Sequence, residues 1–144
     1  MTALTEGQEF NGALRELSTG RILAFSGGPF ATPGWPAKNL HTDRAKAAEA
    51  KLDAPIASGI QCEGDIVRLL IELFGEAWFR HGKLHVKYPR PVFAGASVQS
   101  RARVRSRRVD GAATTIELDV WCETQDKQSV VVGTASCVVP ASRA

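Results

Sequence analysis

His41 is the residue of this sequence best suited to move protons. An imidazole titrates near neutral pH, so it can accept a proton and return it within one reaction. His41 follows a loop rich in Pro and Gly, SGGPFATPGWPAKN at 26–39, and belongs to the stretch LHTDRAKAAEAKLDAPIASG. We predict that His41 is a general acid/base. The alternative is a histidine that is hydrogen-bonded to the loop backbone.

Gly59 stands directly after Ser58, where a long helix is predicted to begin. The first N–H groups of a helix have no partner inside the helix, and the helix dipole attracts negative charge to them. Glycine allows a substrate to approach closely, so the Gly59 N–H is a candidate oxyanion site. Ser58 is predicted to contact the same substrate. In the alternative, Ser58 caps the helix and Gly59 only relieves crowding.

Glu63 lies one turn further into the same predicted helix. The other charged residues of this helix fall on one stripe, at spacings of three and four: Asp65, Arg68, Glu72 and Glu76. At about 100° per residue, Glu63 lies nearly opposite this stripe, among the apolar residues. A carboxylate buried in this way is costly unless it is paired, and such acids are functional candidates. We predict acid/base chemistry for Glu63, or alternatively a purely structural pairing.

Two residues near His41 have two interpretations each. Asp43 precedes the alanine-rich run, where it can cap a helix or orient the histidine. Trp35 lies in the preceding loop, where it can cover a bound apolar ligand or anchor the loop. We include Asp43 among the candidate catalytic residues and Trp35 among the candidate substrate-binding residues.

Four arginines alternate along one predicted strand: Arg101, Arg103, Arg105 and Arg107. Alternation places all four on one face of the sheet. We predict that Arg103 and Arg105 contact phosphate groups of a ligand or an acidic partner protein, with a solvated sheet face as the alternative. No nucleic-acid partner is expected, because the stripe lacks interleaved aromatic residues and the net charge is only +3.

The hydrophobic pattern predicts the elements that position these residues. An apolar stretch predicts one long helix from Gly59 to Arg80, and its broad face carries Ile60, Val67, Leu70, Ile71, Phe74 and Trp78. After His81 the period changes to two, which predicts strands at 82–88, 96–109, 113–123 and 129–139. A first strand is predicted over 8–17, followed by a short helix and a second one at 44–51. The predicted class is α+β, with an antiparallel sheet wrapped around the central helix.

Length and composition indicate a single domain. The chain has 144 residues, of which 44% are hydrophobic and 23% charged, which suits one domain spanning 1–144. Cys62, Cys122 and Cys137 are too widely spaced for a metal site, and free thiols of this kind suggest a cytoplasmic protein. We expect no metal, no export signal and no membrane association, because no apolar run is long enough to span a bilayer.

Three motifs in this order of elements resemble the MaoC-like group of hotdog-fold proteins, which includes (R)-specific enoyl-CoA hydratases. These motifs are LHTD before an alanine-rich helix, PIASG at the start of the central helix, and YPRPVFAG between two strands. The resemblance covers nearly the whole chain. It implies a curved antiparallel sheet around one long helix, a dimer in which two sheets join edge to edge, and an acyl thioester of CoA or a carrier protein as ligand. With this ligand, we expect Trp35 to cover the acyl chain, and Arg103 and Arg105 to contact the phosphates of CoA or an acidic carrier protein.

The resemblance also implies roles for residues. In the family, a His works with an Asp five residues earlier, and the N–H of the first Gly of the central helix binds the thioester oxygen. His41 and Gly59 match these positions, whereas Pro36 stands in place of the Asp, and no Asp or Glu occurs in 27–40.

The implied activity is reversible hydration or dehydration of a 2-enoyl/3-hydroxyacyl thioester, without a cofactor. The absent Asp leaves two alternatives open. One is a double-bond isomerase acting on the same substrates. The other is an inactive, thioester-binding subunit of a heteromeric hydratase, in which an active paralogue supplies the chemistry. We expect a homodimer unless such a paralogue replaces one copy.

Overall fold

Five antiparallel strands form one sheet in the order β1-β3-β4-β5-β2. The computed structural model describes residues 4–140, so both ends of the domain predicted over 1–144 lie outside the described residues. The elements in chain order are β1 (Glu9–Glu16), α1 (Thr19–Ser26), α2 (Arg44–Glu49), α3 (Gly59–Phe74), α4 (Glu76–His81), β2 (Lys83–Lys87), β3 (Ser97–Asp110), β4 (Ala113–Thr124) and β5 (Ser129–Pro140). The predicted strands are confirmed to within a few residues.

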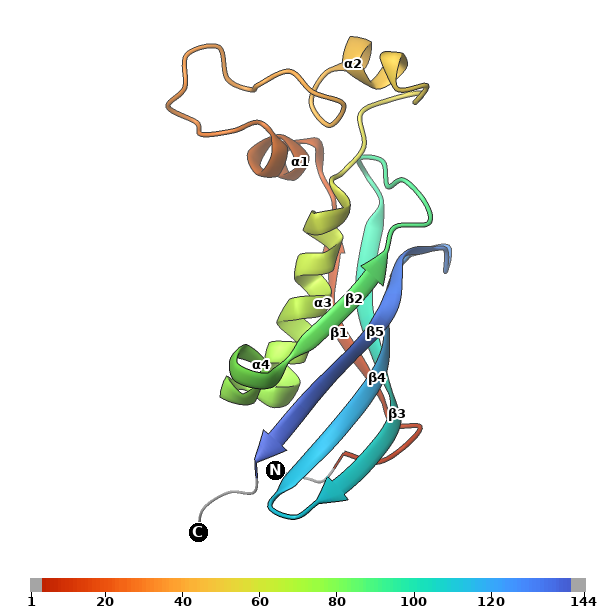
Figure 1. Ribbon diagram of the computed structural model, residues 1–144. Coiled ribbons are helices and arrows are strands. Elements are labelled where there is room, and N and C mark those ends of the chain that lie inside the picture. The colour runs from red at the N-terminus through yellow and green to blue at the C-terminus, as the bar shows by residue number, and fades with distance from the viewer. Residues whose placement is uncertain (1–3, 141–144) are drawn as a thin grey trace.

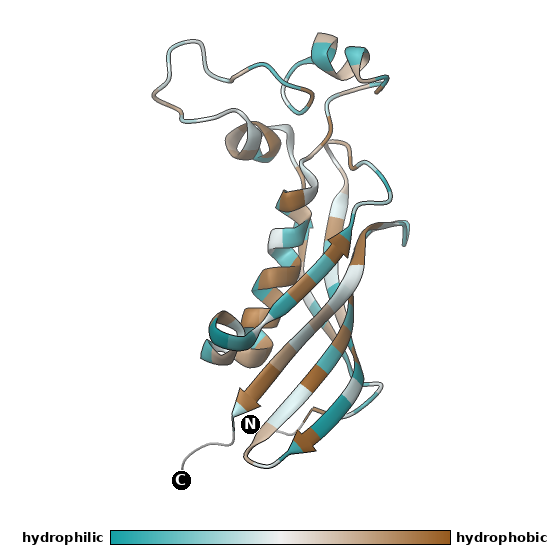
Figure 2. Cartoon of the chain, viewed as in Figure 1, coloured by the Kyte–Doolittle hydropathy of each residue, from teal (hydrophilic) through white to brown (hydrophobic). Residues whose placement is uncertain are grey.

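The sheet curves around α3, as Figure 1 shows, and the helix packs against β1, β3, β4 and β5. Hydrophobic and hydrophilic residues alternate along the strands (Figure 2), so one face of the sheet turns toward the helix. Ile66 and Leu70 of α3 and Leu118 of β4 are fully buried in the core between them. This arrangement confirms the predicted α+β hotdog fold.

The prediction of one long helix over 59–80 is wrong in two respects: where the helix ends, and which of its residues are buried. Gly75 adopts a φ of 55°, a left-handed conformation that suits glycine, and it ends α3 before α4 begins. Ile60, expected in the core, is 62% exposed. Asp65, expected in solvent, is buried because Arg15 of β1 binds its Oδ1 at 2.7 Å. Helix periodicity alone does not reveal an ion pair with a neighbouring strand.

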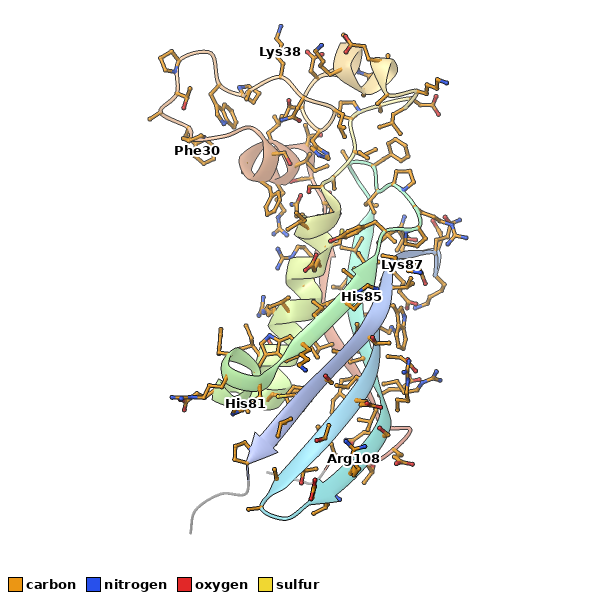
Figure 3. The ribbon with its side chains drawn as sticks, in the orientation of Figure 1. Phe30, Lys38, His81, His85, Lys87 and Arg108 are labelled. Carbon is orange, nitrogen blue, oxygen red and sulfur yellow. The ribbon has the colours of Figure 1, made fainter. Side chains whose placement is uncertain are left out.

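A segment that lies beyond the sheet carries α1, a long loop and α2 (Figure 1). Lys38 of the loop points away from the sheet in Figure 3. Ser18 caps α1 by accepting a hydrogen bond from the Arg21 N–H at 3.2 Å. Asp43 does the same for α2, where its Oδ1 accepts from the Lys46 N–H at 3.0 Å. The segment continues directly into the first turn of α3.

The predicted arginine stripe is wrong at its far end. The register of β3 and β4 shifts between Val104 and Ser106, so Arg105 lies at a bulge. Beyond the bulge Arg107 pairs with Ile116, which is buried and therefore faces the helix side. Only Arg101, Arg103 and Arg105 share the outer face.

Within residues 4–140, none of the helices has the length and hydrophobicity needed to cross a bilayer.

Candidate active site

A cavity of about 480 Å³ opens at the N-terminal end of α3. Its walls come from the segment before α3, the first turn of α3, the chain after β2 and the start of β5. The lining includes His41, Ile56, Ser58, Gly59, Tyr88 and Val130. Three predicted site residues, His41, Ser58 and Gly59, therefore lie in one cavity.

His41 is held in the cavity wall by two hydrogen bonds. Its Nδ1 lies 2.8 Å from the Ile56 carbonyl oxygen, which can only accept, so Nδ1 carries the proton. Its backbone N–H donates to Asn39 Oδ1 at 2.9 Å, and Asn39 Nδ2 donates to the Ser26 carbonyl at 2.8 Å. The Nε2 atom of the neutral ring therefore keeps a lone pair, and it forms no hydrogen bond with the described residues.

Gly59 presents a free N–H at the start of α3. Ser58 has the extended backbone of a helix cap, but its side chain makes no capping hydrogen bond. The Gly59 N–H has no hydrogen-bond acceptor among residues 4–140. A Cβ at Gly59 would come within 2.4 Å of the Tyr88 ring, so only glycine fits at this position. Relief of crowding at Gly59 therefore matches the alternative interpretation, whereas the helix cap by Ser58 that it also included is wrong.

Tyr88 is a site residue that sequence reasoning missed. Its ring packs on Gly59, and its hydroxyl donates a short hydrogen bond to Glu63 Oε2. The Glu63 carboxylate, together with partial burial, raises the pKa of Tyr88 to about 12. Tyr88 is the single tyrosine of the chain and follows β2 directly, before Pro89. Its position at the end of a predicted strand, directly before the PRP motif, is the sequence feature that could have marked Tyr88 as a site residue.

Glu63 is not buried among apolar residues, as its helical position suggested. It is half-buried, because the core face of α3 is centred on Ile66 and Leu70. Its partner is the hydroxyl of Tyr88, which lines the cavity, whereas Glu63 itself does not. The Glu63 carboxylate therefore contacts the cavity only indirectly, through the hydroxyl of Tyr88.

Trp35 and Asp43 lie outside the cavity lining. The Trp35 indole donates to the Gly28 carbonyl at 3.0 Å and packs against Phe30, with ring centroids 4.9 Å apart. These contacts match the interpretation of Trp35 as an anchor of its loop. Asp43 engages the α2 N-terminus, which matches its interpretation as a helix cap.

Arg103 and Arg105 lie on the outer face of the sheet, away from the cavity lining, and both bind Asp119. The arginine that does line the cavity is Arg90, in the chain after β2. His81 and His85 also lie outside the lining, on α4 and β2 (Figure 3). His41 is therefore the one histidine of the chain at this site.

Comparisons with known proteins agree with the fold. The MaoC-like dehydratase from Rhodospirillum rubrum superposes with a TM-score of 0.76 at 20% identity, over 98% of this chain and 96% of that one. The (R)-hydratase from A. caviae, involved in PHA biosynthesis, superposes with a TM-score of 0.72 at 24% identity, over 97% and 100%. The HadBC complex, a 3R-hydroxyacyl-ACP dehydratase from Mycobacterium tuberculosis, gives 0.67 at 12% identity, over 96% and 99%.

No curated protein matches the sequence. Residues 29–128, which include the His41 loop, α3 and most of the sheet, match the family described as MaoC like domain. The chain therefore belongs to the MaoC-like domain family, whose hotdog-fold neighbours include hydratases and dehydratases.

Proposed function

We propose that the protein catalyses reversible hydration of a 2-enoyl thioester of CoA or of a carrier protein. One observation carries this proposal: the His41 ring and the free Gly59 N–H line the same cavity. The pair supplies a base and an oxyanion site, the two groups that conjugate addition to a thioester requires.

The reaction uses each group at a defined atom. The oxygen of water forms a bond to C3 of the substrate while His41 Nε2 takes one of the water protons. The electron pair of the C2–C3 double bond moves to C2 and the thioester oxygen, and the Gly59 N–H stabilises the resulting enolate. Protonation at C2 completes the addition, and the reverse sequence dehydrates a 3-hydroxyacyl thioester.

The proton for C2 requires a second group. The segment 27–40 holds no carboxylate, and Asp43 is engaged in capping α2. We assign the second proton transfer to Glu63, acting through the Tyr88 hydroxyl that lines the cavity. This transfer requires Glu63 to enter the reaction as the neutral carboxylic acid. The tyrosine oxygen then takes the Glu63 proton while the Tyr88 hydroxyl gives its own proton to C2, so no tyrosinate forms. Afterwards Glu63 regains a proton from solvent, and His41 releases to solvent the proton that it took from water.

A second candidate function is double-bond isomerisation of the same thioesters. It is favoured by the absence of any carboxylate in 27–40 to help His41 position water. Moving a proton between two carbons needs only an oxyanion site and one base. A third candidate is a binding subunit that has lost its chemistry and completes a heteromeric hydratase. A structural neighbour, the ChsH1-ChsH2 complex from Mycobacterium tuberculosis, has two components by its name.

We further propose that the protein forms a dimer through a sheet edge. β1 and β2 are the two edge strands, and each leaves one row of backbone groups unpaired within the described chain. Pairing across a two-fold axis would satisfy one such row.

The proposed function is tested by incubating the purified protein with a panel of enoyl-CoA thioesters in deuterated water. Hydration with deuterium at C2 is the expected result. Proton exchange or double-bond migration without hydration would favour the isomerase. Neither reaction, together with tight thioester binding, would favour the inactive subunit.

A further inference from the structure

Arg90 is the only permanently charged residue among the described residues that line the cavity around His41, which we call the His41 cavity. Most of the other lining residues are apolar, among them Ile56 and Ile60. Arg90 itself is exposed, so its side chain lies at the rim of the cavity. It also lines a neighbouring cavity of about 540 Å³, which includes the turn between β4 and β5. Arg90 therefore lies where the two cavities meet.

The backbone around Arg90 is held in place. A proline precedes it and another follows it, which restricts the chain to an extended path. Two residues later, the Val92 carbonyl accepts a hydrogen bond from the Ala57 N–H at 2.8 Å. Ile56, next to Ala57, accepts the hydrogen bond from His41 Nδ1. One short segment before α3 therefore positions both His41 and the chain that carries Arg90.

The Arg90 guanidinium group keeps most of its hydrogen-bond donors free within residues 4–140. Of the five N–H donors of a guanidinium group, one is used here, from Nη1 to the Ser129 carbonyl at 3.3 Å. Arg90 forms no ion pair with any carboxylate of the described chain, Asp126 of the neighbouring cavity included. The group is therefore available to an anionic ligand, and the planar fork of arginine suits a phosphate group.

We infer that Arg90 binds the phosphate group at the end of the carrier arm of the thioester. This inference rests on the proposed function, because it assumes that the thioester carbonyl lies at the Gly59 N–H. The same phosphopantetheine arm occurs in CoA and in carrier proteins. From the thioester carbon to the phosphorus the extended arm measures about 16 Å, whereas a sphere of the cavity's volume is about 10 Å across. The phosphate therefore lies outside the cavity, at its rim, where Arg90 is exposed.

Tyr88 leads from the thioester site to Arg90. Its ring packs on Gly59, and Arg90 follows two residues later, at most about 7 Å along the chain. Arg103 and Arg105, for which a phosphate contact is predicted from the sequence, lie on the outer face of the sheet, where both are paired with a carboxylate. Of these three arginines, Arg90 is the one beside the path of the arm.

Calorimetry with saturated thioesters tests the inference without any turnover. The two probes are S-butanoyl phosphopantetheine and S-butanoyl pantetheine, which differ only in the phosphate group. We expect the wild-type protein to bind the phosphorylated probe at least about fivefold more tightly at low salt, the contribution of one favourable ion pair at an exposed site. Added salt should reduce this ratio. Equal affinity for the two probes, or binding of neither, would overturn the inference.

Three variants assign the preference to one side chain. Arg90→Met removes the charge and should bring the ratio of the two affinities close to one. Arg90→Lys keeps the charge without the planar fork and should keep part of the preference. Lys83→Met is the matched control, because it removes an exposed cation at the other end of β2 that lines neither cavity. A full preference in Arg90→Met, or an equal loss in Lys83→Met, would refute the assignment. Thermal unfolding checks that each variant is folded.

Further probes identify the source of the anion. Butanoyl-CoA and a butanoyl carrier protein both present the phosphate, and a loss of affinity in Arg90→Met with only one of them shows which carrier the residue contacts. S-glutaryl pantetheine carries a carboxylate at the end of its acyl chain and no phosphate. If Arg90→Met weakens binding of this probe and leaves the phosphate preference unchanged, Arg90 binds the acyl chain and the inference is wrong.

Turnover separates this inference from the proposed function. Crotonyl-CoA is assayed for hydration beside the binding experiments. If the phosphate preference holds and crotonyl-CoA does not react, the proposed chemistry fails while the assignment of Arg90 stands. If crotonyl-CoA is hydrated and the preference is absent, only the assignment of Arg90 fails.

Discussion

The Tyr88 hydroxyl donates a hydrogen bond to the Glu63 carboxylate, although the two residues are 25 positions apart in the chain. The same tyrosine ring packs on Gly59, so one side chain joins the first turn of α3 to the end of β2. This contact brings a carboxylate into reach of a cavity whose own loop has none. The proposed chemistry can be tested through this contact and through the residues around it.

Tyr88 should titrate at unusually high pH. The neighbouring carboxylate disfavours the phenolate and raises the pKa of Tyr88 to about 12. Tyr88 is the single tyrosine of the chain, so ultraviolet absorbance reports it alone. In Glu63→Gln the carboxylate charge is gone, and the pKa should fall toward the ordinary value of 10.0. An unchanged titration in that variant would show that the two side chains are not paired in solution.

Tyr88→Phe separates the role of the hydroxyl from that of the ring. It keeps the packing on Gly59 and removes the link to Glu63. We expect kcat for hydration to fall by about 10²-fold, the contribution typical of one general acid, with little change in KM. Glu63→Gln should give a similar loss and flatten the same limb of the pH–rate profile. Full activity in both variants would remove Glu63 and Tyr88 from the mechanism.

Gly59→Ala and Gly64→Ala should change the free energy of unfolding in opposite directions. The first places a Cβ within 2.4 Å of the Tyr88 ring, and such overpacking costs about 1–3 kcal/mol of unfolding free energy. The second meets no atom within 4 Å and replaces a helical glycine, which should stabilise the protein by up to about 1 kcal/mol. Urea unfolding measures both. Equal effects would contradict the close contact of Gly59 with Tyr88.

His41→Gln should abolish the proposed chemistry without unfolding the protein. Because His41 is half-buried, we expect a small change in stability and a loss of about 10²–10⁴-fold in kcat. Asn39→Ala removes the side chain that accepts a hydrogen bond from the His41 N–H and donates one to the Ser26 carbonyl. It should give a smaller loss, because the ring keeps its hydrogen bond to Ile56. Steady-state kinetics with enoyl-CoA and thermal unfolding distinguish the two effects.

Arg15→Met should destabilise the protein in a pH-dependent way. The variant leaves the Asp65 carboxylate buried without its partner, which costs about 1–3 kcal/mol at neutral pH. Burial already raises the pKa of Asp65 above 3.8, and Arg15 opposes that rise, so its removal raises the pKa further. The folded state then binds a proton more tightly than the unfolded state, and stability increases as pH falls toward this raised pKa.

The penalty of Arg15→Met, measured by urea unfolding, should therefore shrink in mildly acidic buffer. Asp65→Asn in the same background is the control, because it has no charge to bury. A penalty that stays constant with pH would show that Asp65 is not the group affected.

The sequence predicted the strands because their alternation of apolar and polar residues is a local property. The strands beginning at Glu9, Ser97, Ala113 and Ser129 lie within a few residues of the predicted ranges. The cap at Ser18 is also a local feature, since it joins two residues only three positions apart in the chain. His41 and Gly59 could be placed at one site because of the resemblance to a family, since a single sequence does not reveal which distant residues meet.

Local patterns failed where a distant residue changed the outcome. Asp65 is buried because Arg15 reaches it from β1, and helix periodicity contains no information about that strand. Arg107 leaves the outer face because a bulge at Arg105 shifts the register with β4.

The sequence by itself therefore determined the order of the elements and the position of His41 before α3. Only the tertiary structure decided which side chains meet there. Tyr88 packs on Gly59 and binds Glu63 because the sheet curves and brings the end of β2 to the start of α3. Such contacts depend on the three-dimensional path of the chain, which residue types and spacing leave open.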